Sequence, residues 1–351
     1  MELMEYLNKV VEHEASDLFL VVGSPACQKL DGRVVPINEE RILPADAERL
    51  IKDIYQRANR SMEEYEKTGD DDFSFAVPGL ARFRVNAYRQ RGSMSAVIRV
   101  VSFMIPDWKA MNIPEEVMEL ADVTHGMIIV TGTANSGKST TQACIIDRIN
   151  QTRECHVITL EDPIEYLHRN VKSLVSQREI AIDTADYTSA LRACMRQSPD
   201  VILLGEMRDA ETISAAITAA ETGHSIITTL HTRGTVNTID RIVDTFPSQQ
   251  QGQVRIQLAS VLHTVVSQQL LPGMDGELIP AFEIMHMNNA IRSLIRDNKN
   301  HQIDNVIASS GAEGMISMDQ YILKLWKEGK ITEATALEYA MNPDQLKRTM
   351  K

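Results

Sequence analysis

The chain has 351 residues, 48 of them acidic and 36 basic, which gives a formal net charge of -12. This acidic balance argues against a general nucleic-acid binder. The four cysteines, Cys27, Cys144, Cys155 and Cys194, lack C-x-x-C spacing, so neither a zinc site nor a disulfide framework is expected. We expect no signal peptide, and no apolar run approaches the ~20 residues needed to span a bilayer. The length predicts about two domains, and the scattered cysteines favour a cytoplasmic protein.

The N-terminal third mixes helical and strand patterns. Apolar residues at helical spacing predict helices over residues 2–14 and 44–60. Four segments are typical of strands: 16–22, 71–77, 81–88 and 95–101. The dipeptide Asp31-Gly32 predicts a hairpin turn. Together these patterns predict an α+β domain over residues 1–104, followed by a linker at 105–116 that contains two prolines and no clear period.

Arginine is dense in the last part of this domain, at Arg82, Arg84, Arg89, Arg91 and Arg99. The plain interpretation is a solvated sheet face. The alternative is that one or two of them reach a nucleotide on a neighbouring domain or subunit, since the guanidinium fork suits phosphate. Strand alternation places Arg82 and Arg84 on one face, opposite Phe83 and Val85. The pattern does not choose among the five.

The most informative stretch is a buried strand at 127–131, a small-residue loop and a helix start. The loop has the pattern Gly132-x-x-x-x-Gly137-Lys138-Ser139. In such loops the backbone N–H groups and the helix N-terminus surround phosphate oxygens. Lys138 is expected to reach the β- and γ-phosphates, and the Ser139 hydroxyl to ligate Mg²⁺. The segment therefore predicts a nucleotide triphosphate site.

Polar residues follow later strands of the same predicted sheet. Three carboxylates, Glu161, Asp162 and Glu165, follow the strand at 155–160, and Glu206 ends the strand at 200–206. The latter resembles a Walker B element with Gly205 at the usual aspartate position. His231 follows the strand at 225–230 and is a candidate γ-phosphate sensor.

His224 precedes the strand at 225–230 and is therefore expected to lie farther from the carboxyl edge of the sheet. A role at a subunit interface or in nucleotide coupling is a weaker prediction for His224 than the sensor role is for His231. The strand-helix alternation over 127–246 predicts a mainly parallel α/β sheet with helices on both faces. We expect a helix over 248–271, a strand over 279–287 and several helices over 288–351.

Together these motifs resemble one family, the hexameric type II/IV secretion ATPases, and within it the type IV pilus retraction ATPases. The resemblance covers nearly the whole chain and is carried, in the family's order, by residues 132–141, 158–166, 205–209 and 222–232. Residues 290–297, AIRSLIRD, resemble the retraction signature AIRNLIRE and differ from it at Ser293 and Asp297. The lack of a tetracysteine motif also distinguishes this chain from most assembly relatives.

The resemblance implies a PAS-like domain (1–104), a linker (105–116), a RecA-like P-loop ATPase core (117–288) and a helical C-terminal region (289–351). It implies a homohexamer that uses ATP and Mg²⁺ to retract pili through an inner-membrane platform protein. An accessory paralogous ATPase is a further expected partner, and no nucleic acid is expected. The expected location is peripheral, at the inner face of the cytoplasmic membrane.

The same resemblance assigns roles by position. Lys138 matches the Walker lysine, Glu165 and Glu206 match the acids used for water and Mg²⁺, and Ser139 with Glu206 would hold the metal. His224 and His231 match the family's histidine box, and Arg84 and Arg99 match its arginine fingers. The residues expected to bind nucleotide are Gly132, Thr133, Ala134, Asn135, Ser136, Gly137, Lys138, Ser139 and Thr140.

Two departures from the family pattern stand out. Thr133-Ala134-Asn135 replaces Pro-Thr-Gly in the loop, and we expect Asn135 to take the left-handed backbone position of that glycine. Arg233-Gly234 is also unusual and could alter the subunit seam. Two alternatives to the retraction motor stay open: an accessory or assembly motor of the same fold, and a nucleotide-gated scaffold with little turnover. A DNA-translocating motor is disfavoured by the net charge.

Overall fold

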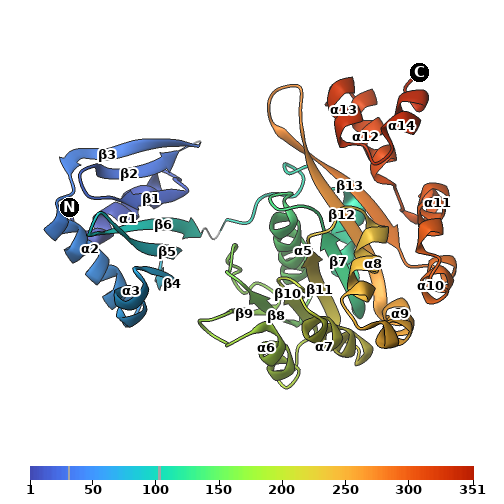
Figure 1. Ribbon diagram of the computed structural model, residues 1–351, viewed down its shortest axis with the longest axis horizontal. Helices are drawn as coiled ribbons and strands as arrows, with labels where there is room; N and C mark the ends of the chain where they lie inside the picture. Colours follow the sequence, from blue (N-terminus) through green and yellow to red (C-terminus); the bar gives the residue numbers. More distant parts are fainter. Residues whose placement is uncertain (31, 102–103) are drawn as a thin grey trace. The chain divides into compact units, whose positions relative to one another are not determined.

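The computed structural model describes residues 1–30, 32–101 and 104–351, and the chain divides into two compact units (Figure 1). The first comprises residues 1–104 with 165–167, and the second comprises residues 105–164 and 168–351. The expected turn residue Asp31 lies outside the described residues, but its flanking strands pair as an antiparallel hairpin. Across the described ranges, no helix combines the length and apolarity that crossing a membrane needs.

The first unit is an α+β domain, as expected. Its sheet is antiparallel, with strand order β3-β2-β1-β6-β5-β4. Alternate apolar side chains of the strands and helices share one core, to which Phe83 and Ile98 belong. The elements are α1 (Leu3–Glu12), β1 (Asp17–Leu20), β2 (Pro25–Leu30), β3 (Arg33–Arg41), α2 (Pro44–Arg57), α3 (Glu63–Thr68), β4 (Asp70–Val77), β5 (Ala81–Gln90) and β6 (Ser93–Val101).

The second unit is built on a seven-stranded sheet of order β13-β12-β7-β11-β10-β8-β9, parallel except for β13. Its central strands are continuous apolar runs, as expected for strands covered on both faces. The strands are β7 (Gly126–Thr131), β8 (His156–Glu161), β9 (Leu174–Glu179), β10 (Val201–Leu204), β11 (Ser225–Leu230), β12 (Leu262–Pro272) and β13 (Leu278–His286).

Helices cover both faces of this sheet and form two separate cores. The adjacent residues Ile128 and Ile129 of β7 point into different cores, because side chains alternate along a strand. One core contains residues of α6 (Tyr187–Cys194), α7 (Ala210–Glu221), α8 (Thr235–Asp244), α9 (Ser248–Val261), α10 (Asn289–Arg296) and α11 (Ile303–Ser309). The other contains residues of α4 (Glu115–Met118), α5 (Lys138–Thr152), α12 (Met318–Lys327), α13 (Glu333–Tyr339) and α14 (Pro343–Thr349).

The expected helix over 248–271 is wrong in its second half. Only α9 is helical, and residues from Leu262 onward form β12. The apolar residues Val261, Leu262 and Val265 fit helical spacing, so the sequence pattern hides the change. Tertiary structure decides it, because β12 pairs with β7 on one side and with β13 on the other.

The segments next to the core also differ from the sequence expectation. Ile113, in the expected linker, is buried in the second unit, and Ile105 and Trp108 pack against the same core. The C-terminal helices likewise belong to the two cores of the sheet rather than to a body of their own. Burial of apolar side chains thus extends the second unit in both directions from residues 117–288.

His263 on β12 and His286 on β13 predict that the folding stability of this unit falls in acid. The Thr264 hydroxyl lies 2.8 Å from His263 Nδ1 and 2.9 Å from His286 Nδ1. Burial lowers the pKa of both imidazoles below the usual value. The unfolded chain therefore binds protons below pH ~6.5 that the folded chain does not, so folding stability falls as the pH falls from there.

We expect urea denaturation to show a smaller loss of stability between pH 7.5 and 5.5 for His286→Asn than for the wild type. His301→Asn, an exposed histidine in the same unit, is the matched control and should keep the wild-type slope. An unchanged slope in His286→Asn would contradict the assignment.

Candidate functional site

The phosphate-binding pattern lies where β7 passes into α5, at the carboxyl edge of the parallel sheet. Gly132 has φ +150°, Asn135 φ +60° and Gly137 φ +85°. The left-handed Asn135 confirms the expectation that it replaces the family glycine. A Cβ on Gly132 would overlap the backbone carbonyl of Gln268, and on Gly137 it would lie 2.8 Å from Gln268 Nε2. The loop therefore needs its glycines for close backbone packing as well as for its turn.

The loop fits a phosphate chain. Lys138 is 7% exposed, and its ammonium group donates to the backbone carbonyls of Gly132 (3.0 Å) and Thr133 (2.7 Å). The Ser136 side chain is 3% exposed, and among the described residues its hydroxyl has no hydrogen-bond partner. The buried Ser136 hydroxyl and the Lys138 ammonium group are donors from which phosphate oxygens can accept hydrogen bonds.

Glu206 lies after β10, and its carboxylate contacts the side chains of Arg208 and His231. One carboxylate oxygen lies 2.5 Å from Arg208 Nη2, and the other lies 3.3 Å from His231 Nε2. Glu206 is 7% exposed, whereas the side chains of Arg208 and His231 are more than half exposed. The structure thus brings together two of the predicted residues, Glu206 and His231, at the ends of neighbouring strands.

Gly205, at the position where the family pattern has an aspartate, is explained by its surroundings. A Cβ there would lie 2.9 Å from the Tyr187 hydroxyl and 3.2 Å from the Leu160 carbonyl oxygen. The backbone of this turn packs directly on β8 and α6, so a side chain does not fit. Glu206 is consequently the acid that this strand end offers.

His224 lies just before β11, at the opposite end of that strand from His231. Residue pairs run from Gly126↔Ser225 to Thr131↔Leu230, so His224 adjoins the start of β7 and Gly132 follows its end. Its Nδ1 lies near the Ala219 carbonyl (3.0 Å) and the Thr222 hydroxyl (3.1 Å). About six strand residues, roughly 20 Å, separate the two ends. The fold does not bring His224 to the phosphate loop of its own subunit, and an interface role stays a prediction.

The remaining predicted residues belong to the first unit. Arg84 and Arg99 are directly opposite each other on β5 and β6, on the exposed face of the sheet, as alternation predicted for Arg84. Arg99 Nε donates to Asp17 Oδ1 at 2.9 Å, and Asp17 is 3% exposed. Arg84 is exposed. Glu165 is exposed and belongs to the segment 165–167, so its role stays a prediction.

Sequence reasoning missed the polar residues of β12 and β13 that lie behind these loops. Glu283 accepts from the backbone N–H groups of Thr235 (2.6 Å) and Met318 (3.2 Å), the first residues of α8 and α12. Burial raises the pKa of this carboxyl, and the two backbone N–H groups oppose that rise. The signal in the sequence was a glutamate within the apolar strand pattern AFEIM, which is unusual unless the charge has partners.

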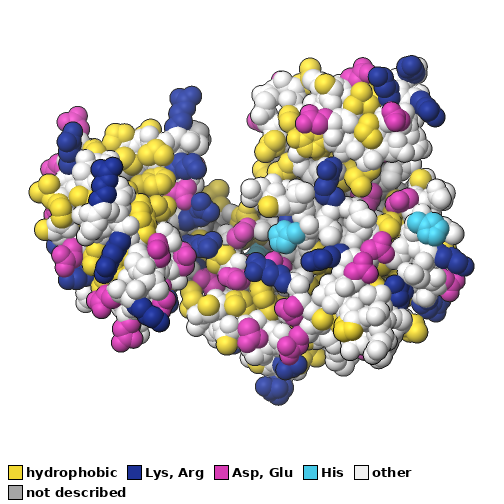
Figure 2. All heavy atoms as spheres, viewed as in Figure 1, with side chains coloured by type: hydrophobic (Ala, Val, Ile, Leu, Met, Phe, Trp, Pro, Cys, Tyr) yellow, Lys and Arg dark blue, Asp and Glu magenta, His cyan; other side chains and the backbone are white. Residues whose placement is uncertain are grey.

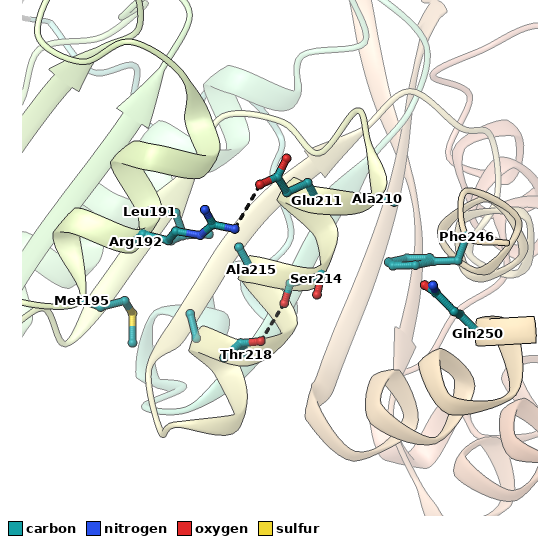
Figure 3. Close-up of a pocket in the computed structure, with 11 residues that line it drawn as sticks. Leu191, Arg192, Met195, Ala210, Glu211, Ser214, Ala215, Thr218, Phe246 and Gln250 are labelled. Atoms are coloured by element: carbon teal, nitrogen blue, oxygen red, sulfur yellow. Dashed lines mark hydrogen bonds and ion pairs between the residues drawn. The ribbon is translucent and has the colours of Figure 1, made fainter.

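Several hollows lie on the surface away from these loops. A groove of about 430 Å³ lies between α6, α7 and the start of α9, with Leu191, Met195 and Phe246 in its wall and the Arg192–Glu211 ion pair at its rim (Figure 3). Its lining residues include none of the predicted site residues. On the face drawn in Figure 2, acidic and basic side chains are interspersed over both units.

The chain is similar to known proteins over nearly its whole length. A family model described as "Type II/IV secretion system protein" matches residues 1–278. The chain belongs to this family. Among its relatives, the type IV pilus retraction ATPase PilT of Pseudomonas aeruginosa is 41% identical over 344 residues, covering 98% of this chain and 99% of the relative. The type IV pilus ATPase PilU of the same organism is 34% identical, covering 100% and 92%.

Solved structures agree with this family assignment. A crystal structure of the pilus retraction motor PilT with bound ADP superimposes with a TM-score of 0.91 at 42% identity, covering 99% of both chains. The ATPase DotB of Legionella pneumophila superimposes with a TM-score of 0.75 at 28% identity, covering 95% of this chain and 94% of DotB. The expected family, and the PAS-like and RecA-like fold that it implied, are confirmed.

Proposed function

We propose that this protein is an ATP-hydrolysing motor that powers retraction of type IV pili. The observation that carries the proposal is the phosphate loop with Glu206 and His231 at the next strand ends of the sheet, in a chain that matches a retraction motor over nearly its whole length. We further propose a homohexamer at the inner face of the cytoplasmic membrane that acts on a membrane-embedded platform protein.

The residues suit hydrolysis at a γ-phosphate. Lys138 neutralises charge on the phosphate oxygens, and an arginine of the first unit or of a neighbour stabilises charge that develops in the transition state. Glu206 or Glu165 orients the attacking water. Ser139 and Glu206 would hold Mg²⁺, which supplies further neutralisation of the phosphate charge when bound. His231 contacts Glu206 and reports the state of the γ-phosphate to the loop that follows β11.

Two measurements test the proposal. Purified protein should release phosphate from ATP, and release should stop when EDTA removes divalent cations. In cells, deletion of the gene should leave long pili that do not retract. Loss of all pili would indicate an assembly motor instead, and absent phosphate release would indicate a nucleotide-gated scaffold.

An accessory motor is the second candidate, because a second pilus ATPase of the same organism, the type IV pilus ATPase PilU, also matches the whole chain. The two candidates differ in what a cell lacking each one shows. A retraction motor should be needed for every retraction event. An accessory motor should be dispensable for part of the retraction, so some retraction events should persist in the deletion strain.

Glu206→Gln is expected to lower kcat about 100-fold, because the amide can neither accept the proton nor carry the charge of a general base. Nucleotide binding should persist, since Lys138 and the loop are intact. Phosphate release and ADP titration measure the two effects. Glu211→Gln, an exposed glutamate on α7, is the control and should behave as wild type. If Glu206→Gln turned over normally, Glu165 would be the remaining candidate for the water.

A further inference from the structure

Three consecutive polar residues of β12, Ser267, Gln268 and Gln269, are almost completely buried, with exposed fractions of 1%, 3% and 6%. They separate the apolar pairs Val265-Val266 and Leu270-Leu271 of an interior strand of the sheet. Burying one such residue without a partner is costly, so three in a row call for three partners. Each has a partner, and the partners lie on the two loops of the candidate site.

Gln268 contacts the phosphate loop. The Thr141 hydroxyl in the first turn of α5 donates to Gln268 Oε1 at 2.7 Å, with both side chains buried. The backbone carbonyl of Gln268 lies against Gly132, and its side-chain amide lies against Gly137. One residue therefore touches both glycines of the loop and the helix that the loop begins.

Ser267 and Gln269 point to the opposite face and contact the loop after β11. The backbone N–H of Gly234 donates to Ser267 Oγ at 3.0 Å, and Arg233 Nη2 donates to Gln269 Oε1 at 2.8 Å. This loop starts at His231, which contacts Glu206. Arg233, expected at a subunit seam, thus has a partner within its own chain.

We propose that Ser267, Gln268 and Gln269 are positioning residues that hold the two nucleotide loops from opposite faces of one strand. Gln268 sets the shape of the phosphate loop and therefore nucleotide affinity. Ser267 and Gln269 set the position of the His231 loop and therefore the rate of the chemical step. The effects on affinity and on rate should be separable, because alternate side chains of a strand lie on opposite faces of the sheet. The inference rests on the proposed ATPase function.

The first arm of the test concerns affinity. Gln268→Met keeps the length of the side chain and removes its hydrogen bonds, so the Kd for ADP should rise about tenfold, the effect expected from one buried hydrogen bond. Thr141→Val should cause the same rise, and the double variant should be no weaker than either single one. Thr141→Ser keeps the hydroxyl and should retain wild-type binding.

The second arm concerns turnover. Gln269→Met and Ser267→Ala should lower kcat about tenfold and leave the Kd for ADP within about twofold of wild type. Gln28→Met is the matched control: Gln28 is 4% exposed, contacts His13, and lies in the first unit. It should change neither parameter, whatever it does to the melting temperature.

The two arms also give the results that would overturn the inference. Wild-type ADP binding in both Gln268→Met and Thr141→Val would do so, and Thr141→Val decides the question if Gln268→Met does not fold. Equal changes in the Kd for ADP, or equal changes in kcat, in Gln268→Met and Gln269→Met would also overturn it. The residues of β12 would then stabilise the whole site without distinguishing its two loops. A Lys138→Ala protein that still binds and hydrolyses ATP would contradict the proposed function instead.

Discussion

Lys138→Ala is expected to reduce ATP hydrolysis about 1,000-fold or more. Lys138 is 7% exposed, and its ammonium group donates to the backbone carbonyls of Gly132 and Thr133. A charge held in so dry a position acts strongly on phosphate oxygens, and removing one preorganised donor of this kind typically costs 100- to 1,000-fold. Loss of a full charge places Lys138 at or above the upper end of that range.

Phosphate release by the purified protein is the measurement, and a thermal melt checks that the variant is folded. Lys172→Ala is the matched control, because Lys172 is exposed in the same unit. It should hydrolyse ATP at the wild-type rate. Normal turnover by Lys138→Ala would overturn both the site and the mechanism.

Arg84→Ala is expected to lower kcat about 1,000-fold while leaving ADP affinity nearly unchanged, which is the effect of removing an arginine finger. Both finger candidates are exposed, but the guanidinium of Arg99 donates to the buried carboxylate of Asp17. Arg84 and Arg99 lie directly opposite each other, and like charges in such a position repel. The carboxylate of Asp17 reduces this repulsion because it offsets the charge of Arg99. We therefore propose Arg84, rather than Arg99, as the arginine finger.

Single-turnover and steady-state rates separate this effect from binding, and the molar mass in solution checks ring assembly. Arg41→Ala, an exposed arginine of the same unit, should be neutral. Arg99→Ala should mainly lower the melting temperature, because it leaves the buried Asp17 without that partner. The reverse outcome, an inactive Arg99→Ala and a normal Arg84→Ala, would assign the finger to Arg99.

Local chemistry explains why the phosphate loop could be predicted from the amino-acid sequence alone. Gly132, Gly137 and Lys138 are needed at fixed spacing because a backbone must wrap a phosphate, and the apolar run before them must be a covered strand. The parallel sheet, the strand ends bearing Glu206 and His231, and the left-handed Asn135 followed from the same local rules. The family followed from the order of those motifs.

Only the tertiary structure decided which of these residues meet. Strand order joins Glu206 to His231, and strand direction separates His224 from the loop. The β12 segment, expected as helix, became a strand because two neighbours pair with it, and its buried glutamine then reaches Thr141. These contacts depend on the register between separate segments, and the residues of the Thr141–Gln268 contact are 127 positions apart. Local pattern does not encode that register, because it is set by which apolar faces pack together.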